Sequence, residues 1–359
     1  MINVLVVEDS QVIRDYLVFI LETDSEIRVI DTADSGEAAL ELVNQRRPDA
    51  ILMDIHLPGI DGFETTRRIM SSNPVPIVVC TASTHFDEVQ MAMRAMEAGA
   101  LAVMKKPKGL GDPDAQAEAA AIIQTLKVMS EVKLVKRWGR VLAAQAPGGA
   151  TAAEPTPRDI AGCDAAIVAI GASTGGPPVV MQILAGLPST FQAPILVVQH
   201  IATSFTVGFA EWLAAGSGLP VHVPQGGEIP LPGHVYVAPD DHHLRVGQGG
   251  ELQVSRDESQ NGLRPSADVL FCSVAERFGR RAIGILLTGM GKDGAAGLNA
   301  MASRGALTVA QDEKSCVVFG MPAEAISLGA ARFVLAPQKI AEFLTTAVRR
   351  DARKEGLDG

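Results

Sequence analysis

The first 110 residues of the chain alternate short apolar runs with longer amphipathic stretches. Short apolar runs bounded by turns are typical of buried strands, and the stretches between them have the spacing of helices. A chain that alternates strand and helix in this way folds with parallel strands joined by crossover helices, which gives a doubly wound α/β sheet. Strands are predicted at residues 4–7, 29–30, 50–53, 77–80 and 101–104.

A second alternation begins near residue 165, with the strand candidates AAIVAIG, PILVVQ, HVYVAP, AIGILL and ALTVA. Glycines around position 248 separate HLRV from ELQV, which predicts a hairpin inserted into this second α/β domain. Between the two alternations, an alanine-rich run that favours helix reaches about Leu142, and the segment AQAPGGATAAEPTP after it has the composition of a linker. We therefore predict two doubly wound parallel-sheet domains at residues 1–125 and 164–349, a helical extension and flexible linker at 126–163, and a charged tail at 350–359.

Composition narrows the classes of function. A net charge of −10 and a pI of about 5.2 argue against nucleic acid as the main partner, because phosphate backbones are bound by basic surfaces. The cysteines lie far apart without a CxxC pair, which predicts reduced thiols rather than a zinc site or disulfides. The N-terminus lacks the basic region of a signal peptide, and no apolar stretch approaches the ~20 residues that span a bilayer. We expect a cytoplasmic protein without membrane insertion.

Charged and hydroxyl side chains follow the predicted strands of the first domain. Glu8 and Asp9 come after the first strand, Asp54 after the third, Thr81 at the end of the fourth and Lys106 after the fifth. Because the carboxyl ends of parallel strands meet at one edge of a sheet, three carboxylates would gather there and repel one another unless a cation such as Mg²⁺ neutralised them. A carboxylate beside a metal, a hydroxyl and a lysine suits phosphoryl transfer onto that carboxylate. Each residue alone is as easily a solvated strand end, but all of them at successive ends favour a site.

Residues 2 to about 125 resemble a response regulator receiver domain, which has a flavodoxin-like fold. The resemblance rests on the motifs VVEDS, MDIHLPGIDG, the TA pair after the fourth strand, and KKP. It implies that Asp54 accepts a phosphoryl group from a histidine kinase, with Glu8, Asp9 and Asp54 around Mg²⁺. It also implies that Thr81 and Lys106 form the switch pair.

A glycine-rich turn follows the first predicted strand of the second domain. Gly171, Ser173 and Gly175 form the pattern G-x-S-x-G, in which a strained turn between strand and helix exposes a serine hydroxyl. The start of the next helix supplies free N–H groups where an oxyanion would form. A dinucleotide-binding loop is the competing interpretation, but it predicts an acidic residue at the end of the next strand, where this chain has Gln199 and His200. His200 would lie within reach of Ser173 if the two strands were neighbours.

The loop LLTGMGKDG follows a third strand candidate and superficially resembles a phosphate-binding loop. Leu286 stands where G-x-x-x-x-G-K-[ST] requires its first glycine, and Asp293 stands where it requires Ser or Thr. Asp293 instead supplies a carboxylate at a third strand end, where it could orient His200 to take a proton from Ser173. The order Ser, His, Asp differs from that of α/β-hydrolases, so that fold is not inferred. Each residue could have a purely structural role, but the three together favour a catalytic triad.

Residues from about 165 to 347 resemble the catalytic domain of the chemotaxis protein-glutamate methylesterases, the CheB family, whose architecture also has a receiver in front. The resemblance rests on the motifs IGASTGG, VVQH, HVYVAP, RPSADVLF, LLTGMGKDGAAGL, AQDEKSCVVFGMPAEAI and LGA. It implies a Rossmann-like α/β catalytic domain with Ser173 as nucleophile, His200 as base and acid, and Asp293 as the partner of His200. It also implies that backbone N–H groups around Thr174 and Met290 bind the oxyanion.

The function implied by this resemblance is a phosphorylation-regulated serine hydrolase of chemotaxis adaptation. It would demethylate glutamate γ-methyl esters on methyl-accepting chemoreceptors, release methanol and deamidate receptor glutamines. Its partners would be those receptors and a chemotaxis histidine kinase; Mg²⁺ would serve receiver phosphorylation, and the esterase would need no cofactor. Two alternatives stay open: a receiver-controlled adaptor that binds a receptor or kinase without chemistry, and a receiver fused to a dinucleotide-binding oxidoreductase, which Ser173 and His200 disfavour.

Overall fold

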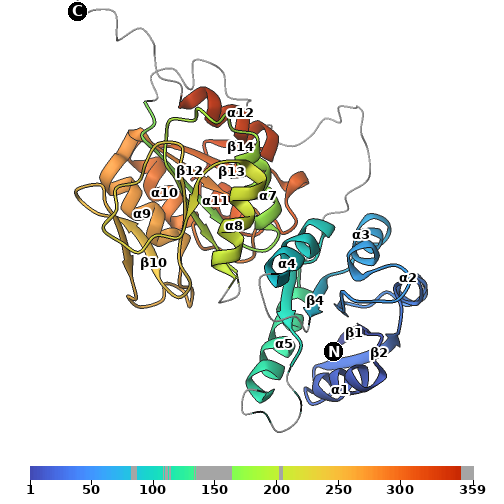
Figure 1. Ribbon diagram of the computed structural model, residues 1–359. Helices are drawn as coiled ribbons and strands as arrows, with labels where there is room; N and C mark the ends of the chain where they lie inside the picture. Colours follow the sequence, from blue (N-terminus) through green and yellow to red (C-terminus); the bar gives the residue numbers. More distant parts are fainter. Residues whose placement is uncertain are drawn as a thin grey trace, which may run out of the picture. The chain divides into compact units, whose positions relative to one another are not determined.

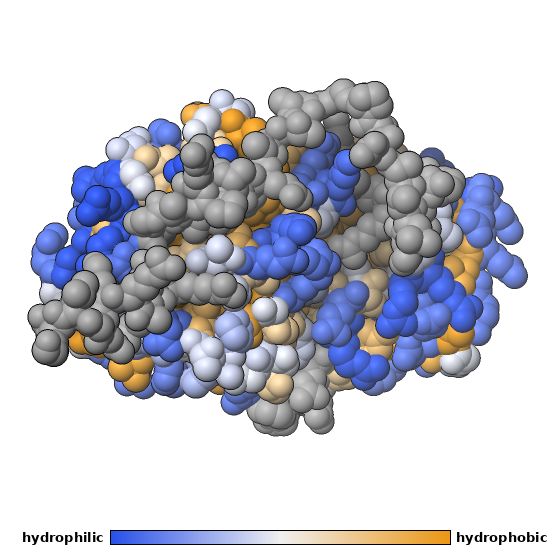
Figure 2. Space-filling model, turned by 90° about the horizontal axis from the view of Figure 1, so that it is seen from above, coloured by the Kyte–Doolittle hydropathy of each residue, from blue (hydrophilic) through white to orange (hydrophobic). Residues whose placement is uncertain are grey.

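The computed structural model describes residues 1–81, 87–107, 109, 112, 115–132, 134, 164–201 and 205–348. The chain divides into two compact units, Met1–Ala146 and Pro147–Gly359, each with its own parallel sheet (Figure 1). Within the described residues, no helix combines the length and the apolar character needed to cross a membrane. Figure 2 shows hydrophilic residues over much of the face that it draws, with smaller hydrophobic areas between them.

The first unit contains a five-stranded parallel sheet in the order β2-β1-β3-β4-β5. Its strands are β1 (Ile2–Val7), β2 (Ile27–Ala33), β3 (Ala50–Met53), β4 (Ile77–Thr81) and β5 (Ala102–Lys105). Its helices are α1 (Gln11–Leu21), α2 (Gly36–Gln45), α3 (Gly62–Ser72), α4 (Asp87–Ala98) and α5 (Ala115–Ser130). β3 and β4 are buried along their whole length, as expected for central strands covered by helices on both faces. The direction of winding reverses between β1 and β3, and ligands of such sheets bind outside the carboxyl ends of the strands at this point.

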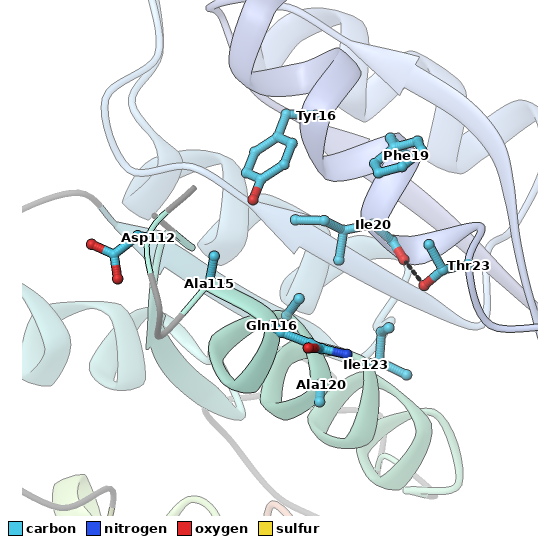
Figure 3. A pocket seen from close by; sticks show the side chains of 10 residues that line it. Tyr16, Phe19, Ile20, Thr23, Asp112, Ala115, Gln116, Ala120 and Ile123 are labelled. Atoms are coloured by element: carbon cyan, nitrogen blue, oxygen red, sulfur yellow. Dashed lines mark hydrogen bonds between the residues drawn. The ribbon is translucent and has the colours of Figure 1, made fainter. Parts of the chain in front are cut away.

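A groove of about 490 Å³ lies between α1 and α5 of the first unit (Figure 3). Phe19 and Ile20 line it from α1, and the small side chains of Ala115, Ala119 and Ala120 leave space on the side of α5. The residues that follow the carboxyl ends of β1 and β3 do not line this groove. It is therefore distinct from the acidic cluster at that edge of the sheet.

The second unit contains a seven-stranded parallel sheet in the order β14-β13-β12-β6-β7-β9-β8. Its strands are β6 (Ile167–Ala172), β7 (Ile195–Gln199), β8 (Val221–His222), β9 (Val235–Val237), β12 (Ala282–Leu286), β13 (Leu307–Gln311) and β14 (Phe333–Leu335). A separate antiparallel hairpin is formed by β10 (His243–Val246) and β11 (Leu252–Ser255). β6, β7, β12 and β13 are buried at every position, which explains their continuous apolar sequences.

Helices connect these strands and cover the sheet. They are α7 (Gly176–Ala185), α8 (Thr206–Ser217), α9 (Ala267–Phe278), α10 (Ala295–Ser303), α11 (Met321–Ser327) and α12 (Pro337–Ala347), with short 3₁₀ turns at Gly279–Arg281 and Glu313–Ser315. α7 packs against α8 and α12, and α9 packs against α10 and β10. Phe271 of α9 and Leu298 of α10 share one apolar core with Leu196 of β7 and Leu244 of the hairpin. This packing fixes α9 and α10 beside the carboxyl end of β12.

The predicted fold class is confirmed: both units are doubly wound parallel α/β structures, and the hairpin lies where the glycines around position 248 predicted it. Two edge strands, β8 and β14, were missed because stretches of two and three residues are too short to show a pattern. α5 ends at Ser130, and a tight turn closed by Val132 N–H and Met129 C=O follows it. The part of the predicted alanine-rich helix from residue 135 to about Leu142 lies outside the described residues. Of the helical extension and linker predicted at 126–163, only residues 126–132 and 134 are described, and the tail at 350–359 lies outside the described residues, so the domain boundaries stay a prediction.

Candidate active site

The three residues predicted as a triad follow three strands that are neighbours in the sheet. Ser173 comes directly after β6, His200 directly after β7, and Asp293 in the loop between β12 and α10. β6 pairs in parallel with β7 on one side and with β12 on the other. The carboxyl ends of β12, β6 and β7 therefore bring the three residues to one edge of the sheet.

The turn that carries Ser173 is held by its backbone. Ser173 N–H donates to Thr288 C=O at 3.0 Å, and Gly176 N–H donates to Ser173 C=O at 2.8 Å. Gly175 has φ +74°, in the left-handed region, and a Cβ added to it would lie 2.5 Å from Cβ of Val317. A glycine is therefore required both by the conformation and by the close approach of Val317. α7 begins immediately after this turn, so the pattern G-x-S-x-G does form a turn between strand and helix.

Gln199 joins the serine turn to the end of β7. Its Nε2 donates to Ser173 C=O and to His200 C=O, each at 2.9 Å, and the side chain is buried. His200 N–H in turn donates to Ala172 C=O at 2.9 Å. The buried amide of Gln199 therefore fixes Ser173 and His200 relative to each other. The sequence predicted only that Gln199 does not bind ribose.

His200 is bound to Asp293 through its Nε2 atom, which lies 2.9 Å from Asp293 Oδ2. In the neutral imidazole one nitrogen carries the proton and the other accepts, so an Nε2–H that donates to Asp293 leaves Nδ1 as the basic nitrogen. In the Ser-His-Asp template of serine proteases the carboxylate takes Nδ1 and the base is Nε2. His200 therefore meets its carboxylate through the other ring nitrogen.

Asp293 is 2% exposed and is saturated with hydrogen bonds. Ser266 Oγ donates to its Oδ1 at 2.6 Å, and Ala267 N–H donates to its Oδ2 at 2.6 Å. Burial by itself would raise the pKa of Asp293, but the hydrogen bonds from His200, Ser266 and the Ala267 N–H outweigh burial and hold the pKa below its ordinary value. The carboxylate is therefore kept ionised, as a partner of a protonated imidazole must be.

The loop after β12 passes close to Ser173. A Cβ added to Gly289 would lie 2.7 Å from Ser173 Cβ and 2.3 Å from Met321 Sδ, so this approach depends on glycine. Met290 follows Gly289, and Thr174 follows Ser173; both are partly exposed. Among the described residues, neither of their N–H groups donates to a backbone carbonyl. They are thus free to donate to an oxyanion, although that role stays a prediction.

The acidic cluster predicted in the first unit forms around Lys106. Lys106 Nζ lies 2.7 Å from Glu8 Oε2 and 3.0 Å from Asp54 Oδ2. Burial by itself would lower the pKa of Lys106, but the carboxylates of Glu8 and Asp54 outweigh it and raise the pKa. For Glu8 burial has the larger effect: it raises the pKa of this carboxyl group despite the nearby ammonium group of Lys106. Glu8 Oε1 and Thr81 Oγ1 are buried and have no hydrogen-bond partner among the described residues, as expected where a further group is to be bound.

Glu8, Asp9 and Asp54 could hold a metal ion. Each offers a carboxylate oxygen, and these oxygens lie within 4.8 Å of one another. An all-oxygen set with one exposed member suits Mg²⁺, which keeps several of its waters and takes only a few protein ligands. The unpartnered Glu8 Oε1 supports the same conclusion, so the residues fit the predicted ion.

Besides Gln199, sequence reasoning missed the part that Ser266 and Ala267 play at the site. A signal was available, because Ser followed by an acidic residue and an apolar run is typical of the start of a helix. Ser266 does cap α9, accepting a hydrogen bond from Val269 N–H at 3.4 Å. The sequence does not show that this helix start faces Asp293, because the contact depends on packing between residues 27 positions apart.

Two family models and full-length relatives match this chain. Residues 168–344 match the family model described as CheB methylesterase, and residues 4–113 match the response regulator receiver domain. The chain is 49% identical to the protein-glutamate methylesterase/protein-glutamine glutaminase of Nitrosospira multiformis, with 97% of each chain covered. A relative of the same description from Syntrophus aciditrophicus is 48% identical, over 96% of this chain and 97% of the relative. The crystal structure of the Thermotoga maritima CheB methylesterase catalytic domain is 41% identical, with a TM-score of 0.49, and covers 50% of this chain and 97% of that one. The chain therefore belongs to the CheB methylesterase family and carries a response regulator receiver domain ahead of its methylesterase domain.

Proposed function

We propose that this chain hydrolyses glutamate γ-methyl esters on chemoreceptors and releases methanol. The observation that carries the proposal is the convergence of Ser173, His200 and Asp293 at three adjacent strand ends, with His200 Nε2 2.9 Å from Asp293 Oδ2. The names of relatives that are 44–49% identical over nearly the whole chain point to the same ester and to glutamine side chains. The ester is a neutral carbonyl compound that needs a nucleophile and a proton carrier, and this site offers both.

The reaction would begin when Ser173 Oγ attacks the ester carbonyl. His200 Nδ1 takes the serine proton, and Asp293 stabilises the imidazolium through the hydrogen bond to Nε2. The tetrahedral oxyanion is bound by the N–H groups of Thr174 and Met290. When the C–O bond to the methoxy group breaks, His200 gives the proton to the methoxide. Methanol leaves, and the acyl group stays bound to Ser173.

The second half of the reaction repeats these steps with water. His200 takes a proton from water, hydroxide adds to the acyl carbonyl, and the proton is returned to Ser173 as the glutamate side chain leaves as the carboxylic acid, which then ionises in water. A glutamine amide passes through the same tetrahedral geometry and releases ammonia in place of methanol. We therefore include deamidation of receptor glutamines in the proposed function.

Regulation through the first unit is the second part of the proposal. Asp54 would accept a phosphoryl group from a chemotaxis histidine kinase, with Glu8, Asp9 and Asp54 holding Mg²⁺, which would offset charge on the phosphoryl oxygens. Lys106 supplies a fixed positive charge beside Asp54, and the Thr81 hydroxyl, which has no hydrogen-bond partner in the described part of the chain, is available to the incoming group. The receiver would restrict access to Ser173 until phosphorylation shifts the population. Such signalling takes place in the cytoplasm, where we place the protein.

Methanol release from methylated receptor membranes, measured with and without a small phosphodonor and Mg²⁺, tests the proposal. Ser173→Ala should lower the rate about 10⁶-fold, and a serine-reactive fluorophosphonate should label the wild-type chain at Ser173. Binding to receptors without methanol release or labelling would favour a non-enzymatic adaptor. Deleting residues 1–143 should raise the basal rate, and an unchanged rate would contradict control by the receiver.

A further inference from the structure

The Asp293 carboxylate lies on the N-terminal end of α9. Its Oδ1 accepts from Ser266 Oγ at 2.6 Å and from Asp268 N–H at 3.3 Å. Its Oδ2 accepts from Ala267 N–H at 2.6 Å and from His200 Nε2 at 2.9 Å. Apart from His200, the donors all come from the cap and first turn of one helix, where free N–H groups and the helix dipole favour an anion.

Ser266, the N-cap of α9, donates from its side chain, and its hydroxyl has a single proton. Ser266 Oγ uses this proton for the hydrogen bond to Asp293 Oδ1, at 2.6 Å. The Ser266 oxygen accepts a longer hydrogen bond from Val269 N–H, at 3.4 Å. Ser266 is 0% exposed, so bulk water does not replace the hydroxyl if it is removed. With Oδ1 held in this way, Oδ2 is the oxygen that faces His200.

A second buried carboxylate makes this arrangement selective. Asp268 follows Ala267 in α9, and its Oδ1 accepts from Gly297 N–H, at the start of α10, at 2.6 Å. Burial raises the pKa of Asp268, and the charge of Asp293 raises it further. The pKa of Asp293 is lowered. The pKa values of two neighbouring carboxyl groups are thus shifted in opposite directions, and Asp293 is the one that ionises more readily.

We propose that Ser266 is a positioning residue for the hydrolytic reaction: its hydroxyl fixes the Asp293 carboxylate with Oδ2 on His200 Nε2, which leaves Nδ1 as the basic nitrogen. The proposal rests on the proposed function. Ser266 touches neither Ser173 nor His200 in the described hydrogen bonds, so it acts through Asp293 alone.

Ser266→Ala tests the proposal in the full-length chain, and Ser273→Ala is a matched control. Ser273 lies on the same helix, is 8% exposed, donates to Leu270 C=O at 2.7 Å and accepts from Val246 N–H at 3.0 Å. Among the described hydrogen bonds, none joins it to Asp293. Both substitutions remove one buried hydroxyl, so a general loss of stability affects them alike. Hydrogen bonds to charged groups typically contribute about 10- to 100-fold in an equilibrium.

We expect Ser266→Ala to lower kcat for methanol release at least about tenfold, with KM nearly unchanged, because substrate binding does not involve Asp293. Ser273→Ala should keep kcat within about threefold of wild type. A readout that needs no activity is the low-field proton NMR resonance of the His200 Nε2–H, which a carboxylate partner produces. It should be lost or shifted in Ser266→Ala and retained in Ser273→Ala.

Equal kcat values in the two alanine variants, or an unchanged resonance in Ser266→Ala, would overturn the positioning role while leaving the proposed function intact. If the wild type itself released no methanol, the proposed function would fail, and the resonance would still decide whether Ser266 orients Asp293. Should Ser266→Ala not fold, Ser266→Thr carries the test. It keeps the hydroxyl, so retention of the resonance and of most of kcat is expected, and loss of both would count against the proposal.

Discussion

Gly175→Ala perturbs the turn of Ser173 in two separable ways. The backbone of Gly175 is left-handed, with φ +74°, which costs an alanine about 1–2 kcal/mol. The new Cβ would also lie 2.5 Å from Val317 Cβ and 2.6 Å from its Cγ2, closer than real Cβ contacts. Relief of such overpacking typically costs about 1–3 kcal/mol more. The expected loss in free energy of unfolding of the methylesterase domain is therefore about 2–5 kcal/mol.

Gly218→Ala is the matched control for this experiment. Gly218 ends α8 with φ +70°, and a Cβ added there would meet nothing within 4 Å. The Gly218→Ala variant should lose only the conformational part of the free energy of unfolding, about 1–2 kcal/mol. The difference between the two variants then measures the contact with Val317 alone.

Urea unfolding followed by circular dichroism gives the two stabilities, with the transition of the receiver as an internal reference. The folded fraction of Gly175→Ala should also show a lower kcat for methanol release, by about 100-fold, because a displacement of about 1 Å at the nucleophile has that effect. If Gly175→Ala were no less stable than Gly218→Ala and kept its kcat, the turn would not be held against Val317 as the structure indicates.

Two further predictions concern charge. Asp268→Asn should stabilise the methylesterase domain at pH 7, because the raised pKa of Asp268 means that ionising it in the folded state costs free energy, while Asn can still accept from Gly297 N–H. Thermal melts should show the gain vanishing below about pH 4, where the carboxyl is protonated in both states; a gain that persisted there would contradict this cause. Lys106→Met leaves Glu8 and Asp54 without their cation and should destabilise the receiver by about 3–5 kcal/mol. Mg²⁺ should raise the melting temperature of this variant more than that of wild type, and equal shifts would argue against a shared site.

Much of the candidate site followed from one rule, that parallel strands end at a common edge. The rule places Ser173, His200 and Asp293 at strand ends, as it does Glu8 and Asp54. It does not say which strands are neighbours. The order β12-β6-β7 puts the strand before Asp293 next to the strand before Ser173, although the two residues are 120 positions apart in the sequence. Pairing over such a distance depends on the packing of the whole domain.

The remainder of the site depends on details that no pattern in the sequence encodes. Which imidazole nitrogen of His200 meets Asp293 is set by the angle at which α9 presents Ser266 and Ala267 to that carboxylate. The role of Gln199 depends on a single rotamer that reaches two carbonyls. Such contacts are decided by tertiary packing rather than by local propensity.

The place of β6 at the centre of its sheet also bears on how the enzyme is made. β6 pairs with β7, which begins at Ile195, and with β12, which begins only at Ala282. During synthesis, one edge of this wholly buried strand therefore stays open until the ribosome has added the residues up to β12. Parallel pairing between such distant segments is slow, because loop closure must precede the contacts that reward it. A growing chain thus holds its proposed nucleophile and base well before Asp293 is added, so the proposed triad is complete only late in synthesis.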